Sequence, residues 1–484
     1  MSQTLTPGLA PPATDARRGP EAGALGVMPV VVVLLPALLA AAVVLFAPQS
    51  MNDGDTLWHV AAGQWMLDHH RVIRADVFSY TFAGQPWHAH EWLGELLMAL
   101  AYRAAGWSGV ALTGAAAAAA TVALLGRELV RRLDPIPALA ALTVAAGCLA
   151  PSLVLRPHLL VLPLLALWTG RLLDARRRGE APALGWAAMM TLWANAHASV
   201  LFALALIGPF ALEAVIAARQ QPWPVIRGWG LFALASVICA LITPFGVGGL
   251  LFPVATAGMA SLSSIVEWRP PDFATLQPLE IAVLAGLFVI ASRGVRIPLL
   301  RLLLLLALLH MSLQHQRHQM LLAVVGVLIL AEAAGRAPVA AVRAPAAAPL
   351  AWIGAGAAIA LMALRLMVPL ELHDGPTLPI AALDETPAAL RAQPVLNDYG
   401  MGGYLIFRGV RPFIDGRTDM YGDAFNARYD AAVASRPALE AVLAEQRVAW
   451  TLMRPGSTAV RLMDAEPGWR RLYTGPYAVV HVRR

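Results

Sequence analysis

Residues 28–59 read MPVVVVLLPALLAAAVVLFAPQSMNDGDTLWH, an unbroken apolar run followed by a short polar segment with two aspartates and a histidine. The apolar part, residues 28–47, has the length of roughly 20 residues that an α-helix needs to cross the hydrocarbon core of a bilayer. Asp53, Asp55 and His59 follow it closely. The stretch therefore predicts a membrane-spanning helix that leads to ionisable side chains at one membrane surface.

The rest of the chain repeats this apolar pattern. The protein has 484 residues, of which 58% are hydrophobic and 14% charged, and its mean hydropathy of +0.62 does not fit a soluble protein. We predict a mainly α-helical, polytopic transmembrane bundle of about eleven spans. The predicted spans are residues 28–47, 107–127, 136–151, 157–173, 183–195, 198–217, 228–244, 278–292, 297–313, 318–335 and 350–368.

The charge pattern indicates membrane topology. The formal charge is +6, the basic residues are all arginine, and they lie mostly in short loops between apolar runs, which argues against nucleic-acid binding. We interpret residues 1–27 as a disordered cytoplasmic N-terminal extension before an uncleaved signal anchor. Every arginine-rich loop then falls inside, as the positive-inside rule requires. The sequence predicts a multi-pass inner-membrane protein, with the lipid bilayer as a partner.

One alternative topology is open at the short span 183–195. A break around residues 193–199 within one longer helix would give an even number of membrane crossings and place the C-terminal tail in the cytoplasm. We prefer a tight extracytoplasmic turn there, because it keeps all later arginine loops cytoplasmic and the tail extracytoplasmic. The two cysteines, Cys148 and Cys239, lie inside apolar runs and imply no disulfide.

With this topology, the ionisable residues of the opposite loops all fall on the extracytoplasmic side. We therefore expect them to border one cavity that is open to that side. They are Asp53, Asp55, His59, His88, His90, Glu91, Arg156, His158, His197, Glu267, Arg269, His315, Arg317 and His318, together with Asn195.

The first outer loop, residues 48–106, is long enough to have structure of its own. We predict amphipathic helices at the membrane interface over residues 56–68 and 91–105, with His59 near the polar edge of the first. Asp53 or Asp55 caps the first helix, or the pair supplies a general base or an electrostatic or metal anchor beside a phosphate leaving group. One cap does not need two aspartates.

Several other outer residues have both a functional and a structural interpretation. His88, His90 and Glu91 are candidate ligands of a divalent metal, the one cofactor we consider, or partners of neighbouring loops and lipid headgroups. Arg156 is a candidate phosphate ligand, or the ion-pair partner of Glu267 or Asp55. The candidate substrate-binding residues are Arg156, His158, His197, Glu267, Arg269, Arg317 and His318, with helix–helix hydrogen bonds as the alternative for Asn195 and His197.

The tail, residues 369–484, predicts a small extracytoplasmic α/β domain. It contains no P-loop, dinucleotide fingerprint or nucleophile elbow. Asp398, Asp415, Arg417 and Asp419 follow predicted strand ends, where we favour turn formation over ligand binding. The predicted strands are residues 394–396, 412–415, 449–453, 469–473 and 478–482, and the predicted helices are residues 424–434 and 438–446.

The motifs together resemble the bacterial membrane proteins with the GT-C glycosyltransferase fold. The resemblance spans residues 28–484 and implies an extracytoplasmic transferase that moves a sugar from a polyprenyl-phosphate donor, with Asp55 or Asp53 as the catalytic residue that acts on the acceptor. Gly54 separates two acidic residues that are often adjacent in this fold. The motifs are Asp53–His59, Pro86–Trp92, Arg156–His158, Trp193–His197, Glu267–Phe273, Asn397–Tyr404 and Phe413–Arg417.

Two other functions are compatible with the sequence. A transporter or a scaffold for envelope assembly is the non-enzymatic alternative, although we find no internal repeat of the kind that transporters show. Another lipid-linked group transferase, for phosphoethanolamine or acyl groups, is the enzymatic alternative. It would need a Ser or Thr nucleophile or a metal cage on the outer side, and no clear one is present.

Overall fold

The computed structural model describes residues 20–47, 53–335 and 347–484. Within them, eight helical segments are long and apolar enough to cross a membrane. Residues 20–27, assigned above to the N-terminal extension, form the first turns of α1, while residues 1–19 lie outside the described part. The helices of the bundle are α1 (Pro20–Phe46), α3 (Trp92–Val130), α4 (Pro135–Leu149), α5 (Pro157–Arg178), α6 (Met189–Ala196), α7 (Val200–Ala217), α8 (Pro222–Ala240), α9 (Val247–Ala257), α10 (Pro278–Arg293), α11 (Leu299–Gln314), α12 (Gln319–Leu321), α13 (Val327–Ala334) and α14 (Ala347–Met367).

Each of the eleven predicted spans coincides with helical structure, because long apolar runs satisfy their backbone polar groups best as helices. The count of eleven crossings stays a prediction. The span at 183–195 consists of a short 3-10 turn and the eight-residue α6, and α10 and α11 have 16 residues each. These three helices are shorter than the roughly 20 residues of a full crossing.

The first outer loop contains α2 (Gly54–His69), which confirms the predicted helix over residues 56–68. The second predicted helix of this loop is not separate from the span after it. Both belong to the 39-residue α3, which bends at Ala105 and at Gly106, where φ is +57°. Gly106 permits this left-handed backbone without steric cost, so the chain turns there and continues as a helix. His59, predicted near a polar edge, is buried at 3% exposure.

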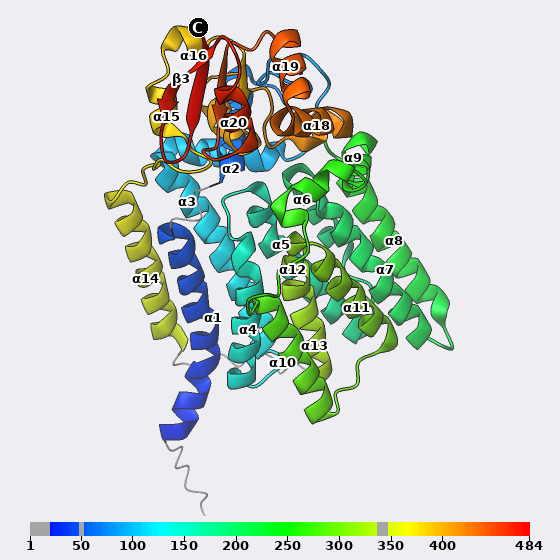
Figure 1. Cartoon of the computed structure of the whole chain (residues 1–484). Helices are drawn as coiled ribbons and strands as arrows, with labels where there is room; N and C mark the ends of the chain where they lie inside the picture. Colours follow the sequence, from blue (N-terminus) through cyan, green and yellow to red (C-terminus); the bar gives the residue numbers. More distant parts are fainter. Residues whose placement is uncertain (1–19, 48–52, 336–346) are drawn as a thin grey trace, which may run out of the picture.

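Helix α3 forms the centre of the bundle and packs against α1 and α5. Its middle is a run of six alanines, residues 115–120, and Ala118 is fully buried. Small side chains let helices approach closely, which is how helices associate where no water drives them together. Figure 1 shows α1 and α14 side by side along one flank of the bundle.

Buried ion pairs join the C-terminal end of α3 to other helices. Arg132 is 2% exposed and contacts Glu128, Asp174 at 3.3 Å and Glu332 at 2.8 Å. Glu213 pairs with Arg301 at 2.8 Å in the same bundle. Arg132 lies between two predicted spans and Arg301 within the predicted span 297–313, and both are neutralised by carboxylates from neighbouring helices, as buried charges require.

The C-terminal domain is built on a four-stranded mixed sheet in the order β1-β2-β4-β3. β1 and β2 run parallel, and β4 pairs antiparallel with β2 and β3. Its strands are β1 (Val395–Asn397), β2 (Trp450–Met453), β3 (Trp469–Thr474) and β4 (Val479–Arg483). Its helices are α15 (Ile380–Asp384), α16 (Ala388–Arg391), α17 (Gly402–Phe407), α18 (Thr418–Ala434), α19 (Arg436–Glu445) and α20 (Thr458–Asp464).

The strand predicted at residues 412–415 is wrong. This segment runs as an extended loop whose backbone is bonded by the Asn397 side chain instead of by a strand. Asn397 Nδ2 donates to the carbonyl of Ile414 at 2.8 Å, and the Phe413 N–H donates to Asn397 Oδ1 at 2.8 Å. The side-chain amide thus takes the bonds that a neighbouring strand would otherwise provide, and the apolar pattern alone does not reveal this.

The C-terminal domain docks on the first outer loop, next to α2 and the start of α3, at the opposite end of the bundle from the start of α1 (Figure 1). Arg417 is 1% exposed and pairs with Asp76 of the loop and with Asp415 of the domain, both at 2.6 Å. The Thr81 hydroxyl donates to the carbonyl of Phe413 at 2.7 Å. The loop and the domain therefore form one continuous layer.

We predict that Arg417→Ala lowers the free energy of unfolding by about 3–5 kcal/mol, because it leaves two buried carboxylates without their cation. Arg428→Ala is the matched control: Arg428 pairs with Glu445 on the exposed side of α18, where ion pairs contribute little. Chemical unfolding of both variants in detergent micelles measures the difference. Equal stability of the two variants would contradict the docking role of Arg417.

Candidate functional site

Asp53 and Asp55 lie at the start of α2 and make different contacts there. Asp53 precedes the helix with an extended backbone, and its carboxylate accepts hydrogen bonds from the Thr56 N–H at 3.3 Å and the Thr56 hydroxyl at 3.0 Å. It is the N-cap, as one of the two aspartates was predicted to be. Asp55 instead accepts a hydrogen bond from Trp58 Nε1 at 3.0 Å. Only one aspartate is thus used by the cap.

The guanidinium of Arg156 lies between three carboxylates, and we call Arg156, Asp53, Asp55 and Glu267 the Arg156 cluster. Nε and Nη2 donate to the two oxygens of Asp53 at 2.7 and 2.6 Å. Nη1 lies 3.0 Å from Asp55 Oδ2 and donates to Glu267 Oε1 at 3.1 Å. The structure therefore forms the ion pairs that were the alternative to a phosphate contact of Arg156, and the phosphate contact stays a prediction.

The three carboxylates of the cluster differ in how readily they take a proton. Burial opposes the charge of Asp53, but the charge of Arg156 and hydrogen bonds from Arg156 and Thr56 lower its pKa to about 2. Burial raises the pKa of Asp55 above its ordinary value despite Arg156, and repulsion from Asp53 adds to the rise. Burial of Glu267 is outweighed by Arg156 and Arg317, so its pKa is lowered. Of these three carboxylates, Asp55 therefore binds a proton most readily.

The C-terminal domain covers the Arg156 cluster with backbone. A Cβ atom built on Gly416 would lie 1.9 Å from Asp55 Oδ1, and one on Gly403 would lie 2.0 Å from the carbonyl of Gly54. Nearby, the Tyr399 hydroxyl is 2.7 Å from the Thr418 hydroxyl. Sequence reasoning missed Gly416 as a site residue. Its only signal was that it falls inside the Phe413–Arg417 motif.

A second polar cluster surrounds Glu91, the residue before α3. The Nε2 atoms of His197, His90 and His59 lie 3.3, 3.5 and 3.6 Å from its carboxylate. The N–H of Ser199 donates to His197 Nδ1, which leaves the proton of the neutral ring on the Nε2 that faces Glu91. The Glu91 carboxylate therefore accepts a hydrogen bond from the His197 imidazole, and the two side chains do not bind a common metal ion in this arrangement.

His88 does not join this second cluster. Its ring lies 5.1 Å from the ring of Phe245 and 5.6 Å from that of Phe252.

Burial disfavours the charge of His90, but the hydrogen bond and charge of Glu91 raise the pKa of His90 to about 9, so His90 and Glu91 form an ion pair at neutral pH. Across residues 20–47, 53–335 and 347–484, no group of three or more His, Cys, Asp or Glu residues is placed to hold a metal ion. Metal binding by His88, His90 and Glu91 stays a prediction.

The remaining predicted residues form the rim of the site. Arg317 Nη1 lies 3.8 Å from Glu267, and its guanidinium stacks 4.5 Å from the centre of the Trp268 ring. His318 lies 5.9 Å from the same ring, while Arg269 Nε donates to the carbonyl of Ser263. Two further residues bond to the backbone: His158 Nε2 contacts the carbonyl of Ser152 at 2.8 Å, and Asn195 Nδ2 donates to the carbonyls of Thr191 and Ile242.

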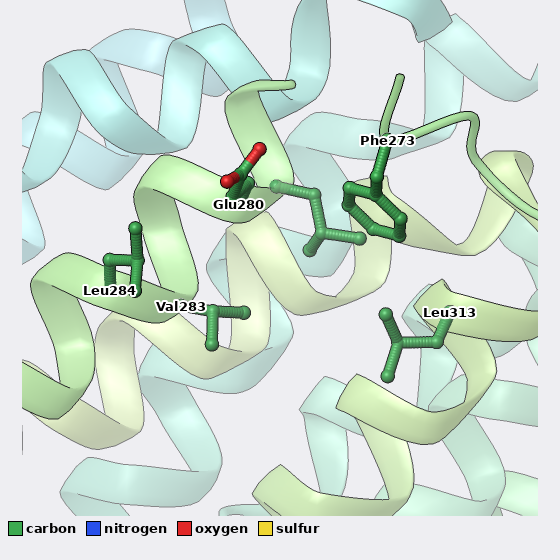
Figure 2. A pocket seen from close by; sticks show the side chains of 6 residues that line it. Phe273, Glu280, Val283, Leu284 and Leu313 are labelled. Carbon is green, nitrogen blue, oxygen red and sulfur yellow. The ribbon is translucent and has the colours of Figure 1, made fainter. Parts of the chain in front are cut away.

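An apolar cavity of about 300 Å³ opens beside the segments that supply Glu267 and Arg317. Figure 2 shows Glu280, Val283 and Leu284 of α10 on one side, with Phe273 and Leu313 opposite. Phe273 follows Arg269 on the same loop, and Leu313 precedes Arg317 by four residues. Glu280 is the one charged residue of the lining, and the other lining side chains are apolar and suited to contact hydrocarbon.

No family model matches the chain, and no curated protein does. Among solved structures, the apo crystal structure of the Archaeoglobus fulgidus oligosaccharyltransferase is similar, with a TM-score of 0.50 and 12% identity over 87% of this chain and 69% of that chain. The same enzyme tethered by a disulfide to an acceptor peptide with the NVT sequon has a TM-score of 0.50 and 13% identity over 87% of this chain and 68% of that chain. The archaeal oligosaccharyltransferase AglB from Archaeoglobus fulgidus, in complex with an inhibitory peptide and a dolichol-phosphate, has a TM-score of 0.49 and 12% identity over 87% of this chain and 69% of that chain.

The chain has the GT-C fold. This confirms the fold that the sequence motifs implied. The chain is mainly helical, and its small sheet lies in the C-terminal domain, which docks next to α2 (Figure 1). Because one fold hosts many activities, the function rests on what the side chains of the site can do.

We predict that Gly416→Ala lowers the free energy of unfolding by about 1–3 kcal/mol, because the added methyl group forces the Asp55 carboxylate away from Trp58 and Arg156. The same change in an Asp55→Ala background removes the atom it collides with. A double-mutant cycle, measured by thermal unfolding in detergent, should therefore show that Gly416→Ala costs less in that background. Additive effects of the two substitutions would contradict the contact.

Proposed function

We propose that this protein is a membrane glycosyltransferase that moves a sugar from a polyprenyl-phosphate donor to an acceptor on the extracytoplasmic side of a bacterial inner membrane. The GT-C fold supports this proposal, as does the clustering of the predicted outer residues under the C-terminal domain. In this topology, the N-terminus is cytoplasmic and the C-terminal domain extracytoplasmic. The loops rich in arginine then face the cytoplasm.

The observation that carries the proposal is the different state of the two aspartates. Asp53 caps the helix and accepts from Nε and Nη2 of Arg156, whereas Asp55 has a raised pKa and contacts Arg156 through one oxygen. A general base needs a pKa closer to neutrality than that of an ordinary aspartate. We therefore assign Asp55 as the base and Asp53 as the residue that positions it.

The reaction follows from these positions. Asp55 takes the proton of the acceptor hydroxyl or amide as the acceptor atom bonds to the anomeric carbon of the sugar. The bond from that carbon to the phosphate oxygen breaks, and the electron pair leaves with the polyprenyl phosphate. Arg317 at the rim, whose contact with Glu267 is 3.8 Å long, is placed to bind that phosphate.

The apolar cavity beside the rim suits the other part of the donor. A polyprenyl chain is hydrocarbon, and the wall formed by Val283, Leu284 and Leu313 would bind it next to the loop that carries Glu267. The phosphate then lies at Arg317 and the chain extends along α10 toward the lipid. His158, His197, Arg269 and His318 stay candidates for contacts to the sugar.

We predict that Asp55→Asn lowers the transfer rate by at least about 10²-fold, because the amide cannot accept the proton of the acceptor. Asp53→Asn should have a smaller effect, since it weakens the cap and the pair with Arg156. Asp68→Asn, an exposed aspartate on the same helix, is the control and should keep full activity. The measurement is sugar transfer from a polyprenyl-phosphate sugar by purified protein. Unchanged transfer in both site variants would remove the proposed base.

We predict that Val283→Trp raises the KM for a long-chain donor by about tenfold, or ~1.4 kcal/mol, because the indole fills the cavity. A donor with one or two isoprene units should be used as before. Ile281→Trp, exposed on the opposite side of α10 from Val283, is the matched control. Equal KM values for the long-chain donor in both variants would show that the chain does not occupy this cavity.

A further inference from the structure

Three carboxylates from two separate segments of the chain meet at a single cation in the site. Asp53 and Asp55 come from the start of α2, Glu267 from the loop before α10, and the cation between them is the guanidinium of Arg156. Carboxylate oxygens are the ligands that Mg²⁺, Mn²⁺ and Ca²⁺ prefer, but with the guanidinium between them these three carboxylates are not placed to share a metal ion. Here a side chain of the protein itself fills the position between them.

The contacts of Arg156 leave no room for a metal ion among these oxygens. Both oxygens of Asp53 accept from the guanidinium, in the forked geometry that arginine forms with carboxylates. Its Nη1 lies against one oxygen each of Asp55 and Glu267. A divalent ion would have to displace an arginine that is paired with three carboxylates, which would leave the charge of the arginine uncompensated.

The backbone fixes the guanidinium in this position. Arg156 precedes Pro157, and the proline ring restricts the residue before it to extended conformations. Its φ and ψ are −123° and 162°, and its N–H donates to the carbonyl of Val154 at 2.8 Å. The arginine is therefore held at the entrance of α5 and directed at the carboxylates before any ligand binds.

We infer that Arg156 is the resident cation of the site and takes the place of a divalent metal between Asp53, Asp55 and Glu267. As a part of the protein, it balances the carboxylates at every metal concentration and stays charged at any physiological pH. Its consequence for catalysis rests on the proposed function: sugar transfer proceeds without a metal bound at these three residues. The occupancy of the cation position itself does not depend on that function.

Binding of Mn²⁺ to the purified full-length protein, followed by electron paramagnetic resonance, tests this inference. The wild-type protein should show no Mn²⁺ site that depends on Asp53. Arg156→Ala vacates the position between three carboxylates, and we expect it to bind one Mn²⁺ at least about tenfold more tightly than the wild type does. Adding Asp53→Asn to Arg156→Ala should abolish this site.

Two variants serve as controls. Arg156→Lys keeps a positive charge among the carboxylates and should not gain the Mn²⁺ site. Arg317→Ala removes another arginine near Glu267, but not the one between the three carboxylates, and should not gain it either. If Arg317→Ala or Arg156→Lys bound Mn²⁺ as Arg156→Ala does, the site would not be the position of the Arg156 guanidinium, and the inference would fail.

Two results would overturn the inference directly. One is a wild-type Mn²⁺ site that Asp53→Asn removes, and the other is a folded Arg156→Ala protein that binds no Mn²⁺. Should Arg156→Ala not fold, titration of the wild type and of Asp53→Asn still decides the question. Because these are binding measurements, a chain that transfers no sugar would contradict the proposed function and leave the Mn²⁺ result standing.

Discussion

The contact of Arg156 with three carboxylates holds together the segments from which the site is made. Partly buried charges are costly unless they are paired, so this arginine and these carboxylates stabilise one another. The pairing fixes the start of α2 against the start of α5 and against the loop at Glu267. It also separates the two aspartates chemically, since both oxygens of Asp53 accept from Arg156, whereas Asp55 contacts Arg156 through one oxygen and accepts from Trp58 with the other.

The helix bundle below the Arg156 cluster and the C-terminal domain above it both help to hold the cluster in place. Below it, the alanine-rich middle of α3 lets α1 and α5 pack closely, and the buried contacts of Arg132 tie the far end of α3 to α5 and α13. Above it, the C-terminal domain is fastened to the first outer loop by Arg417 and lies with Gly416 directly on Asp55. The start of α2 is thus covered by backbone of the C-terminal domain on one side and packs against α3 on the other, while the side chains of Asp53 and Asp55 stay 12% and 26% exposed.

The helices were predictable from sequence because length and apolar composition alone determine them, and the N-cap role of one aspartate follows from a local rule. The partners of the ionisable residues were not, because they depend on which segments meet in three dimensions. From the sequence, Arg156 could bind a phosphate or form an ion pair. His88 was grouped with His90, although the ring of His88 packs on Phe245. Residues 412–415 were predicted as a strand from their apolar pattern, yet the side chain of Asn397 bonds their backbone.

The most direct test is a structure of the protein in lipid nanodiscs with a non-cleavable polyprenyl-phosphonate sugar. We predict that the phosphonate contacts Arg317, that the sugar faces Asp55, that the prenyl chain lies along α10, and that Arg156 stays on Asp53. A ligand bound at the other end of the bundle, near Arg132, or a sugar on the side of Arg317 away from Asp55, would contradict a transferase site at the Arg156 cluster.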